Sequence, residues 1–287
     1  MTQSSPESRL LGALTPRTIT VDTHPVSVHI ADGPAAATPV VLIHGSGPGA
    51  SAWSNWRPLI GELAGDRKVI APDLYGFAST PAPPGMDLNV HEWSAQVIGV
   101  LDAEGIDSAH LVGNSYGAAI ALHTALVHPQ RIGRVALTGG ISLRHAITPG
   151  LRATWSYTPS RAAMRHVLEE FAYDRALVTD SLVEQRYAAT VLPGVDEAFR
   201  SAFHEPLQDA LDAACHTADE LSGLTQPTLI IHGREDRIIP VQTSIDLMHV
   251  IADARLHVLG QCGHWTAVER TAELTALLRA FLSADEA

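Results

Sequence analysis

The segment that most constrains the fold is a predicted strand, sharp turn and helix centred on Gly113-Asn-Ser-Tyr-Gly117. An apolar run over residues 109–112 precedes the turn, and an alanine-rich stretch over residues 118–128 follows it. The pattern G-x-S-x-G at such a bend is typical of a nucleophile elbow, in which a strained backbone exposes a serine hydroxyl above a parallel sheet. A glycine-rich turn without catalytic function is the alternative. The strand–helix context favours Ser115 as a nucleophile.

Two further candidate catalytic residues each follow a predicted strand, and their order along the chain is informative. Asp236 comes after the apolar run 227–233, and His264 comes after the run 255–259. Serine, aspartate and histidine in this order are typical of α/β-hydrolases and differ from the order in chymotrypsin-like and subtilisin-like enzymes. His264 would take the proton of Ser115, and Asp236 would fix the histidine tautomer and stabilise the imidazolium. The sequence therefore predicts a catalytic triad.

The remaining pattern predicts an α/β-hydrolase fold, a mostly parallel eight-stranded sheet flanked by helices. Alternating apolar and polar residues over 18–21 and 26–30 indicate a hairpin, and alternating strands and helices then indicate a parallel sheet covered on both faces. Strand-like runs stop between residues 143 and 207, where helical stretches at 161–171, 179–190 and 195–203 predict an inserted helical cap. The predicted core comprises residues 17–142 and 208–284, the cap 143–207, and a flexible lead-in 1–16.

Composition and charge indicate which classes of protein and partner this chain fits. The 287 residues include 46% hydrophobic and 17% charged residues, typical of a globular protein. A net charge of −12 argues against a nucleic-acid partner. The sequence lacks a secretory signal and any run of about 20 apolar residues that would cross a bilayer, and its two cysteines show no disulfide or metal-binding spacing. We therefore expect a cytoplasmic protein without a membrane partner, and the scattered histidines predict no metal site.

Acyl chemistry also requires donors for a developing oxyanion. The backbone N–H of Tyr116, directly after the predicted nucleophile, is one candidate. The second is the backbone N–H of Ser46, in the glycine-rich loop His44-Gly-Ser-Gly-Pro-Gly49 after the strand at residues 40–43. A phosphate-binding loop is the competing interpretation, and it fails because the sequence G-K-[ST] is missing.

The same loop resembles a known family. Residues 44–56, His-Gly-Ser-Gly-Pro-Gly-Ala-Ser-Ala-Trp-Ser-Asn-Trp, are similar to the corresponding loop of meta-cleavage-product hydrolases, the carbon–carbon bond hydrolases of aromatic degradation. Residues 113–118, 233–240 and 262–265 resemble three further motifs of this family, and parts of the cap also resemble it. The resemblance covers residues 17–283 and points to enzymes like 2-hydroxymuconic semialdehyde hydrolase. The chain departs from the usual S-M-G-G with Ser115-Tyr-Gly-Ala118.

The resemblance implies roles for individual residues. Ser115, Asp236 and His264 would form the triad, and the amides of Ser46 and Tyr116 the oxyanion hole. Four more residues would contact the dienoate end of a small-molecule substrate: Asn55, Asn114, Arg186 and Trp265. A guanidinium suits a carboxylate and a neighbouring 2-oxo oxygen. Asn114 and Trp265 could instead be purely structural, and Arg186 a surface residue. The family also implies no cofactor and a homo-oligomer, dimeric or larger.

The predicted function is therefore hydrolysis of a C–C bond in a 2-hydroxy-6-oxo-hexa-2,4-dienoate. The substrate would ketonise, and Ser115 would then transfer the acyl group to water. A carboxylesterase or lactonase with the same triad is the alternative. Dehalogenases and epoxide hydrolases are less consistent with the sequence, because they place aspartate at the position of Ser115. A catalytically silent receptor of the same fold is a third hypothesis, which the complete triad disfavours.

Overall fold

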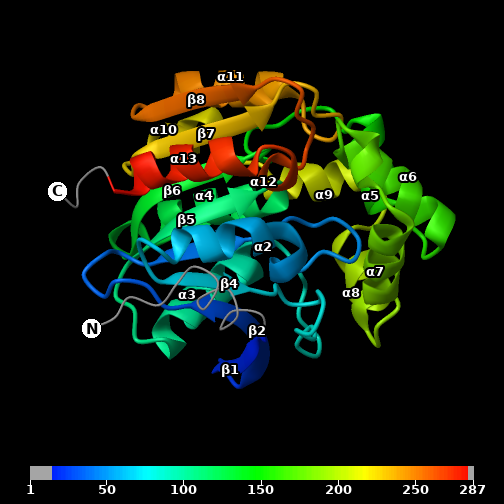
Figure 1. Cartoon of the computed structure of the whole chain (residues 1–287), viewed down its shortest axis with the longest axis horizontal. Coiled ribbons are helices and arrows are strands. Elements are labelled where there is room, and N and C mark those ends of the chain that lie inside the picture. The colour runs from blue at the N-terminus through cyan, green and yellow to red at the C-terminus, as the bar shows by residue number, and fades with distance from the viewer. Residues whose placement is uncertain (1–14, 284–287) are drawn as a thin grey trace.

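The computed structural model describes residues 15–283, so the predicted lead-in at residues 1–16 lies almost wholly outside the described residues. Eight strands form one sheet in the order β1-β2-β4-β3-β5-β6-β7-β8 (Figure 1). The first two strands pair antiparallel, β2 also pairs antiparallel with β4, and β3 to β8 run parallel. The strands are β1 (Arg17–Val21), β2 (His24–Ala31), β3 (Val40–Ile43), β4 (Val69–Pro72), β5 (Ala109–Asn114), β6 (Ile132–Thr138), β7 (Thr228–Gly233) and β8 (Ala254–Leu259). This confirms the predicted architecture.

Helices cover both faces of the sheet (Figure 1). They are α2 (Ala52–Leu63), α3 (Val90–Ala103), α4 (Tyr116–Val127), α5 (Pro149–Trp155), α6 (Arg161–Phe171), α7 (Asp180–Thr190), α8 (Val195–Ala202), α9 (Leu207–Ala214), α10 (Ala218–Ser222), α11 (Val241–Val250), α12 (Thr266–Glu269) and α13 (Thr271–Leu282), with short 3-10 turns η1 (Pro129–Arg131) and η2 (Arg175–Leu177). Val40 and Leu42 pack with α2 and α13, whereas Val41 and Ile43 pack with α3 and α4. Successive strand residues point to opposite faces, so one apolar strand supplies both core layers.

Local sequence explains where the elements begin and end. The turn between β1 and β2 holds Asp22 and Thr23 with φ of 45° and 72°, the left-handed backbone that a tight hairpin requires. Asn89 caps α3 by accepting hydrogen bonds from the N–H groups of His91 and Glu92. Gly105 follows α3 with φ of 64°, which ends the helix. The hairpin confirms the sequence prediction.

A group of helices separates β6 from β7. Helices α5 to α8 lie beside the carboxyl ends of the parallel strands, at the right of Figure 1. We propose that residues 143–207 form a cap distinct from the core, and we use "cap" for this segment. The sequence did not indicate α5, or α9 and α10 beyond the cap. Helix α9 contacts α4, and α10 contacts α4 and α11, so the chain returns to the core at α9.

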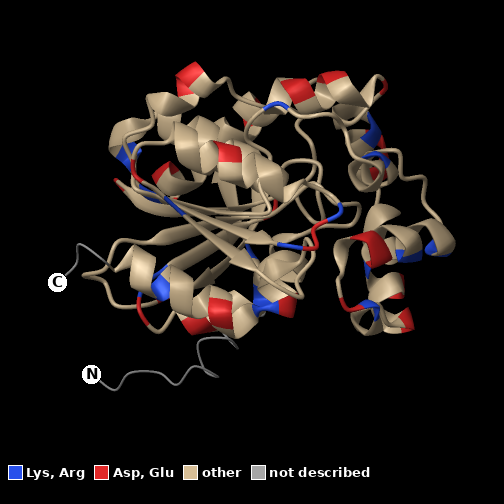
Figure 2. Ribbon diagram, turned by 90° about the horizontal axis from the view of Figure 1, so that it is seen from above, with Lys and Arg blue, Asp and Glu red and all other residues tan. Residues whose placement is uncertain are grey.

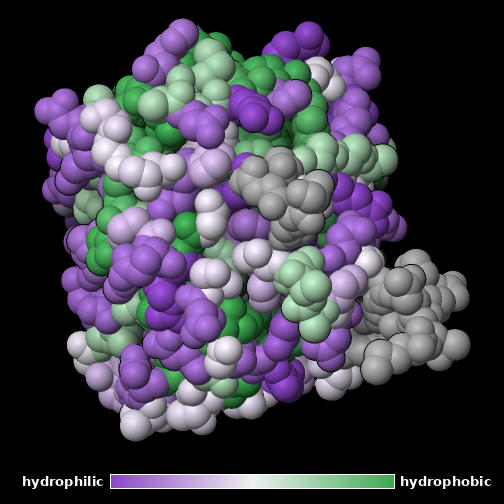
Figure 3. Space-filling model, turned by 90° about the vertical axis from the view of Figure 1, so that its left-hand side faces the viewer, coloured by the Kyte–Doolittle hydropathy of each residue, from purple (hydrophilic) through white to green (hydrophobic). Residues whose placement is uncertain are grey.

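The surface of the protein carries charged, other hydrophilic and apolar residues. Charged residues lie mainly on the outer helices and loops, and few lie on the central strands (Figure 2). On the face opposite the cap, hydrophilic residues alternate with small apolar patches (Figure 3). Within residues 15–283, no helix combines the length and apolar character needed to cross a bilayer.

The strand order creates a switch point between β3 and β5. The chain moves from β3 outward to β4, then returns to place β5 on the opposite side of β3. In open α/β sheets, ligands bind outside the carboxyl ends of strands at such a point. The loop after β3 and the turn after β5 therefore meet where a site is expected.

Candidate active site

The turn after β5 holds Ser115 in a strained conformation. Its φ of 55° and ψ of −118° are rare for a residue with a side chain. Glycines on either side make the turn possible. A Cβ on Gly113 would lie 2.2 Å from the carbonyl oxygen of Gly117, and one on Gly117 would lie 2.3 Å from that of Ile43. The G-x-S-x-G pattern is thus a steric requirement of the elbow, as the sequence predicted.

Asp236 and His264 form a hydrogen-bonded pair at the ends of β7 and β8. His264 Nδ1 lies 2.7 Å from Asp236 Oδ2, and both side chains are buried. His264 lines the same cavity as Ser115 and its side chain is only 3% exposed, so the imidazole faces the serine cavity rather than bulk solvent. The structure therefore brings together the three residues that the sequence predicted as a triad.

The Asp236 carboxylate is held by donors on both oxygens. The N–H groups of Ile238 and Ile239 donate to Oδ1 at 2.7 and 3.0 Å. Burial alone would raise the pKa of Asp236, but the charges and hydrogen bonds of His264 and His232 outweigh burial and hold it below its ordinary value. Asp236 is therefore ionised at neutral pH and ready to stabilise an imidazolium.

Two residues that support this pair were missed by the sequence analysis. Gly139 follows β6 with φ of 51°, and a Cβ there would lie 3.0 Å from Asp236 Oδ2 and 3.2 Å from His264 Nδ1. The double glycine after β6 was its only signal. His232, within β7, lies with Nε2 3.3 Å from Asp236 Oδ2 and 3.0 Å from the Ile239 carbonyl oxygen. Because both neighbours of Nε2 are acceptors, this nitrogen carries a proton. Ser244 Oγ contacts the other ring nitrogen at 2.7 Å.

We expect His232→Phe to lower kcat about 10- to 100-fold, because losing this donor lets Asp236 turn and misplaces the catalytic imidazole. KM should change little, because His232 does not line the cavity that holds Ser115. His232→Gln retains an N–H donor and should recover most of the rate. Steady-state kinetics and thermal denaturation of both variants check this. A His232→Phe protein that is less stable but has normal kcat would contradict the positioning role.

The predicted oxyanion residues come from two segments of the core. Ser46 lies in the loop after β3 and lines the cavity, and Tyr116 is the first residue of α4, where backbone N–H groups have no partner within the helix. The cap reaches both residues through Trp155, whose Nε1–H donates to Ser46 Oγ at 2.9 Å and whose ring packs edge-on against Tyr116. No local sequence pattern indicated this contact.

The four predicted substrate-contact residues all line the Ser115 cavity. Asn55 Oδ1 accepts from the Gly45 N–H at 3.5 Å. Asn114 is already engaged, because its Nδ2 donates to the backbone and side-chain oxygens of Thr138 at 3.0 and 3.1 Å. The Asn114 amide therefore joins β5 to β6, which is the structural role that the sequence analysis gave as the alternative to substrate contact. Trp265 packs edge-on against Phe171 of the cap, with ring centroids 5.6 Å apart.

Arg186 is a buried cation from α7. Nε and Nη2 donate to the Pro48 carbonyl oxygen at 3.2 and 2.9 Å, and Nη1 donates to Ser54 Oγ at 3.2 Å. The residue is 6% exposed, so it is not the surface arginine of the alternative interpretation. Burial lowers the pKa of Arg186 to about 10, which leaves it charged at neutral pH. Within residues 15–283 no carboxylate forms an ion pair with it.

The Ser115 cavity is lined by both polar and apolar side chains. Arg186 and Asn55 contribute polar groups, and Leu151 and Ile238 contribute apolar surface. Its volume of about 20 Å³ is far below the ~300 Å³ and more of typical ligand pockets. Substrate binding therefore requires cap and core side chains to move apart. Ser115, a buried acid–histidine pair and backbone donors at a strand switch point define a serine hydrolase of the α/β class.

Comparisons with known proteins agree with this class. The profile of the alpha/beta hydrolase family matches residues 40–277. A 2-hydroxymuconate semialdehyde hydrolase from Pseudomonas sp. strain CF600 is 47% identical over 88% of this chain and 89% of its own. A 2-hydroxy-6-oxo-2,4-heptadienoate hydrolase from Pseudomonas putida F1 is 45% identical over 88% and 91%. The crystal structure of a meta-cleavage product hydrolase from Pseudomonas fluorescens IP01 superposes with a TM-score of 0.91 at 42% identity, covering 93% of this chain and 97% of that one. The chain belongs to the alpha/beta hydrolase family and, within it, to the meta-cleavage-product hydrolases.

Proposed function

We propose that this enzyme hydrolyses the C5–C6 bond of a 2-hydroxy-6-oxo-hexa-2,4-dienoate. The observation that carries the proposal is Arg186, a buried guanidinium that shares a cavity with Ser115 and His264. A buried charge without a charged partner is costly, and a carboxylate ligand removes that cost. A hydrolase for neutral esters would gain nothing from such a cation. The relatives named as dienoate hydrolases act on substrates that carry this carboxylate.

The proposed mechanism has two stages. Arg186 anchors the carboxylate and the neighbouring 2-oxo oxygen while the dienol ketonises. Ser115 then attacks the C6 carbonyl as His264 takes its proton, and the Ser46 and Tyr116 amides stabilise the oxyanion. Ketonisation has already placed a proton on C5, so the electron pair of the breaking C5–C6 bond is taken up as a dienolate, whose C2 oxygen then receives the proton that His264 took from Ser115. Water, activated by His264, releases the acyl group, which gives 2-hydroxypenta-2,4-dienoate and a carboxylic acid.

We propose that the substituent on C6 is hydrogen or methyl. The names of the two relatives specify an aldehyde in one substrate and a methyl ketone in the other. The Ser115 cavity has a volume of only about 20 Å³, and Trp155, which donates to its lining residue Ser46, stacks on Phe203 with ring centroids 4.7 Å apart. Comparing kcat/KM for the hydrogen, methyl and phenyl dienoates tests this, and a preference for phenyl would contradict it.

Replacing Arg186 tests the carboxylate role. We expect Arg186→Gln to lower kcat/KM for the dienoate about 100- to 1,000-fold, the effect of losing a buried charged hydrogen-bond pair. Hydrolysis of a neutral ester such as p-nitrophenyl acetate should remain within about threefold, because the triad is untouched. Disappearance of the dienoate and release of p-nitrophenol are both followed by absorbance.

The outcomes separate the two candidate functions. Arg186 also anchors the loop after β3 through Pro48, so Arg186→Gln removes both the charge and this anchor. Arg186→Lys keeps the charge and therefore helps to separate the two effects. An equal loss on both substrates would indicate a structural role. Rapid ester turnover by the unaltered enzyme, without any loss of dienoate absorbance, would favour a carboxylesterase or lactonase.

We further propose that the enzyme is cytoplasmic and forms a homo-oligomer. Burial raises the pKa of both thiols, Cys215 and Cys262, to about 12, which suits thiols that remain reduced and unreactive. The edge strand β8 leaves Val258 43% exposed, and such an edge is available for self-association. Light scattering on the purified enzyme measures the oligomeric state.

A further inference from the structure

A second cavity adjoins the Ser115 cavity between core and cap. Its volume is about 510 Å³, and it is lined by residues of α2, α7, α12 and the loops beside them. Arg186 and Trp265 line both cavities, so these two side chains form the boundary between them. We call this second cavity the vestibule. Several of its lining residues are exposed, so the vestibule opens to solvent.

The vestibule is positively charged in an acidic protein. Arg57 and Arg186 line it, and none of its lining residues is acidic, whereas the whole chain carries a net charge of −12. Arg57 is exposed on α2, and within residues 15–283 no hydrogen bond or ion pair engages its side chain. A cleft lined by one sign of charge concentrates ligands of the opposite sign and accelerates their association.

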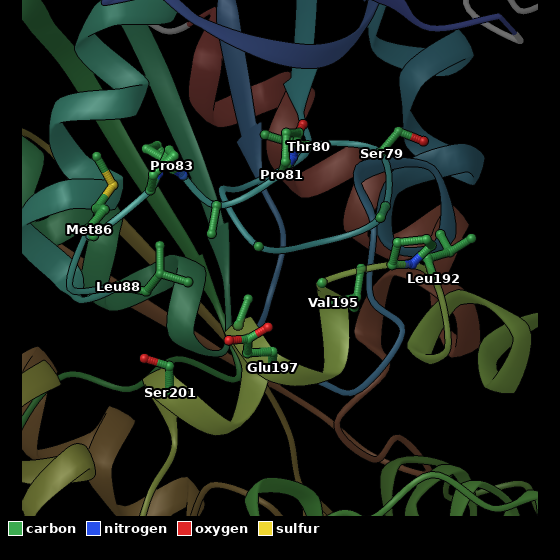
Figure 4. A pocket seen from close by; sticks show the side chains of 18 residues that line it. Ser79, Thr80, Pro81, Pro83, Met86, Leu88, Leu192, Val195, Glu197 and Ser201 are labelled. Atoms are coloured by element: carbon green, nitrogen blue, oxygen red, sulfur yellow. The ribbon is translucent and has the colours of Figure 1, made fainter.

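A larger groove lies elsewhere, between the proline-rich loop at residues 78–88 and α8 (Figure 4). Its volume is about 660 Å³, but it shares no lining residue with the Ser115 cavity. Glu197 is its one charged lining residue, so its charge opposes entry of a carboxylate. Size alone would favour this groove, whereas charge and continuity with the site both favour the vestibule.

We propose that the anionic substrate enters through the vestibule, where Arg57 captures its carboxylate before Arg186 receives it. The inference rests on the proposed function in one respect, the negative charge of the substrate. It assigns Arg57 to a transient carboxylate site and Trp265 to the boundary that opens during entry. Because Arg186 lines both cavities, the carboxylate end of the ligand would lie nearest the vestibule, and the C6 end would reach Ser115.

Charge reversal tests capture by Arg57. In the inactive Ser115→Ala protein, stopped-flow absorbance measures the association rate of the dienoate. We expect Arg57→Glu to lower this rate about 10-fold, within the range of steering effects at a rim charge. Arg255→Glu on β8 changes the net charge equally at an exposed position outside the vestibule, and should change the rate less than about twofold. Equal association rates for the two variants would overturn the role of Arg57.

Obstruction tests the route itself. Ala189 on α7 lines the vestibule, and Ser201 on α8 lines the larger groove. We expect Ala189→Trp to slow association and dissociation of the dienoate by the same factor of about five or more, with Kd unchanged, because a route affects the barrier and not the end states. Ser201→Trp should change neither rate. The reverse pattern would assign entry to the larger groove.

Failure of the route and failure of the proposed function can be distinguished. Labelling of Ser115 by a fluorophosphonate reports access to the nucleophile in proteins that retain Ser115, whether or not dienoates are hydrolysed. Slower labelling in Ala189→Trp, with normal labelling in Ser201→Trp, supports the route even if the enzyme consumes no dienoate. Unchanged labelling in Ala189→Trp refutes the route even if the dienoate is cleaved.

Discussion

Replacing Ser115 by alanine is expected to lower kcat for the dienoate about 10⁶-fold while leaving its Kd within about threefold. The loss is large because the acyl-enzyme can no longer form, whereas Arg186 and the rest of the cavity still bind the ligand. The backbone at residue 115 has φ of 55°, a strain that alanine would share with serine, so the elbow should keep its shape. Single-turnover absorbance with excess enzyme measures binding and cleavage separately.

Ser46→Ala is the matched control for this experiment. Ser46 lies in the same cavity, but its proposed contribution is a backbone N–H, which alanine retains. The substitution removes only the oxygen that accepts from Trp155 Nε1–H, so we expect kcat to fall less than about tenfold. A Ser115→Ala protein with more than a few per cent of normal kcat would contradict covalent catalysis. Comparable losses in both variants would mean that Ser115 acts through structure.

The triad could be predicted because its signals are local. A glycine must stand wherever a Cβ would collide with backbone, and the elbow places two such positions beside Ser115. Asp236 and His264 each follow an apolar strand, and parallel strands bring their carboxyl ends to one edge. The positions of these residues after parallel strands are therefore enough to predict that they lie close together, and no side-chain contact has to be known.

Contacts between distant segments could not be predicted in this way. Trp155 and Ser46 are 109 residues apart, and no local pattern links an indole in the cap to a loop of the core. In the sequence, His232 is one more residue of a predicted buried strand. Its role follows only from its contacts with Asp236 and Ser244 in the structure. Helix α5 was missed because Pro149 and Gly150 weaken a helical pattern, although Thr148 caps it and proline suits its first position.

Replacing Asp236 by asparagine is expected to lower kcat about 10⁴-fold, because the structure fixes how an asparagine would lie. The N–H groups of Ile238 and Ile239 both donate to Oδ1. An asparagine must therefore place its oxygen there and its NH₂ group toward His264 Nδ1. Two donors cannot face each other, so Nδ1 would become the acceptor and the ring proton would move to Nε2. The imidazole could then no longer accept the proton of Ser115.

The neighbouring carboxylate provides the control for this variant. Glu235 accepts from the Cys262 N–H at 3.0 Å and pairs with Arg234, but it does not contact the imidazole of His264. Glu235→Gln keeps an acceptor for Cys262, and we expect kcat to fall less than about fivefold. Nitrogen NMR of the His264 ring reads the tautomer directly in folded Asp236→Asn protein. A proton remaining on Nδ1, or a kcat above about a tenth of normal, would show that the tautomer is set by something other than Asp236.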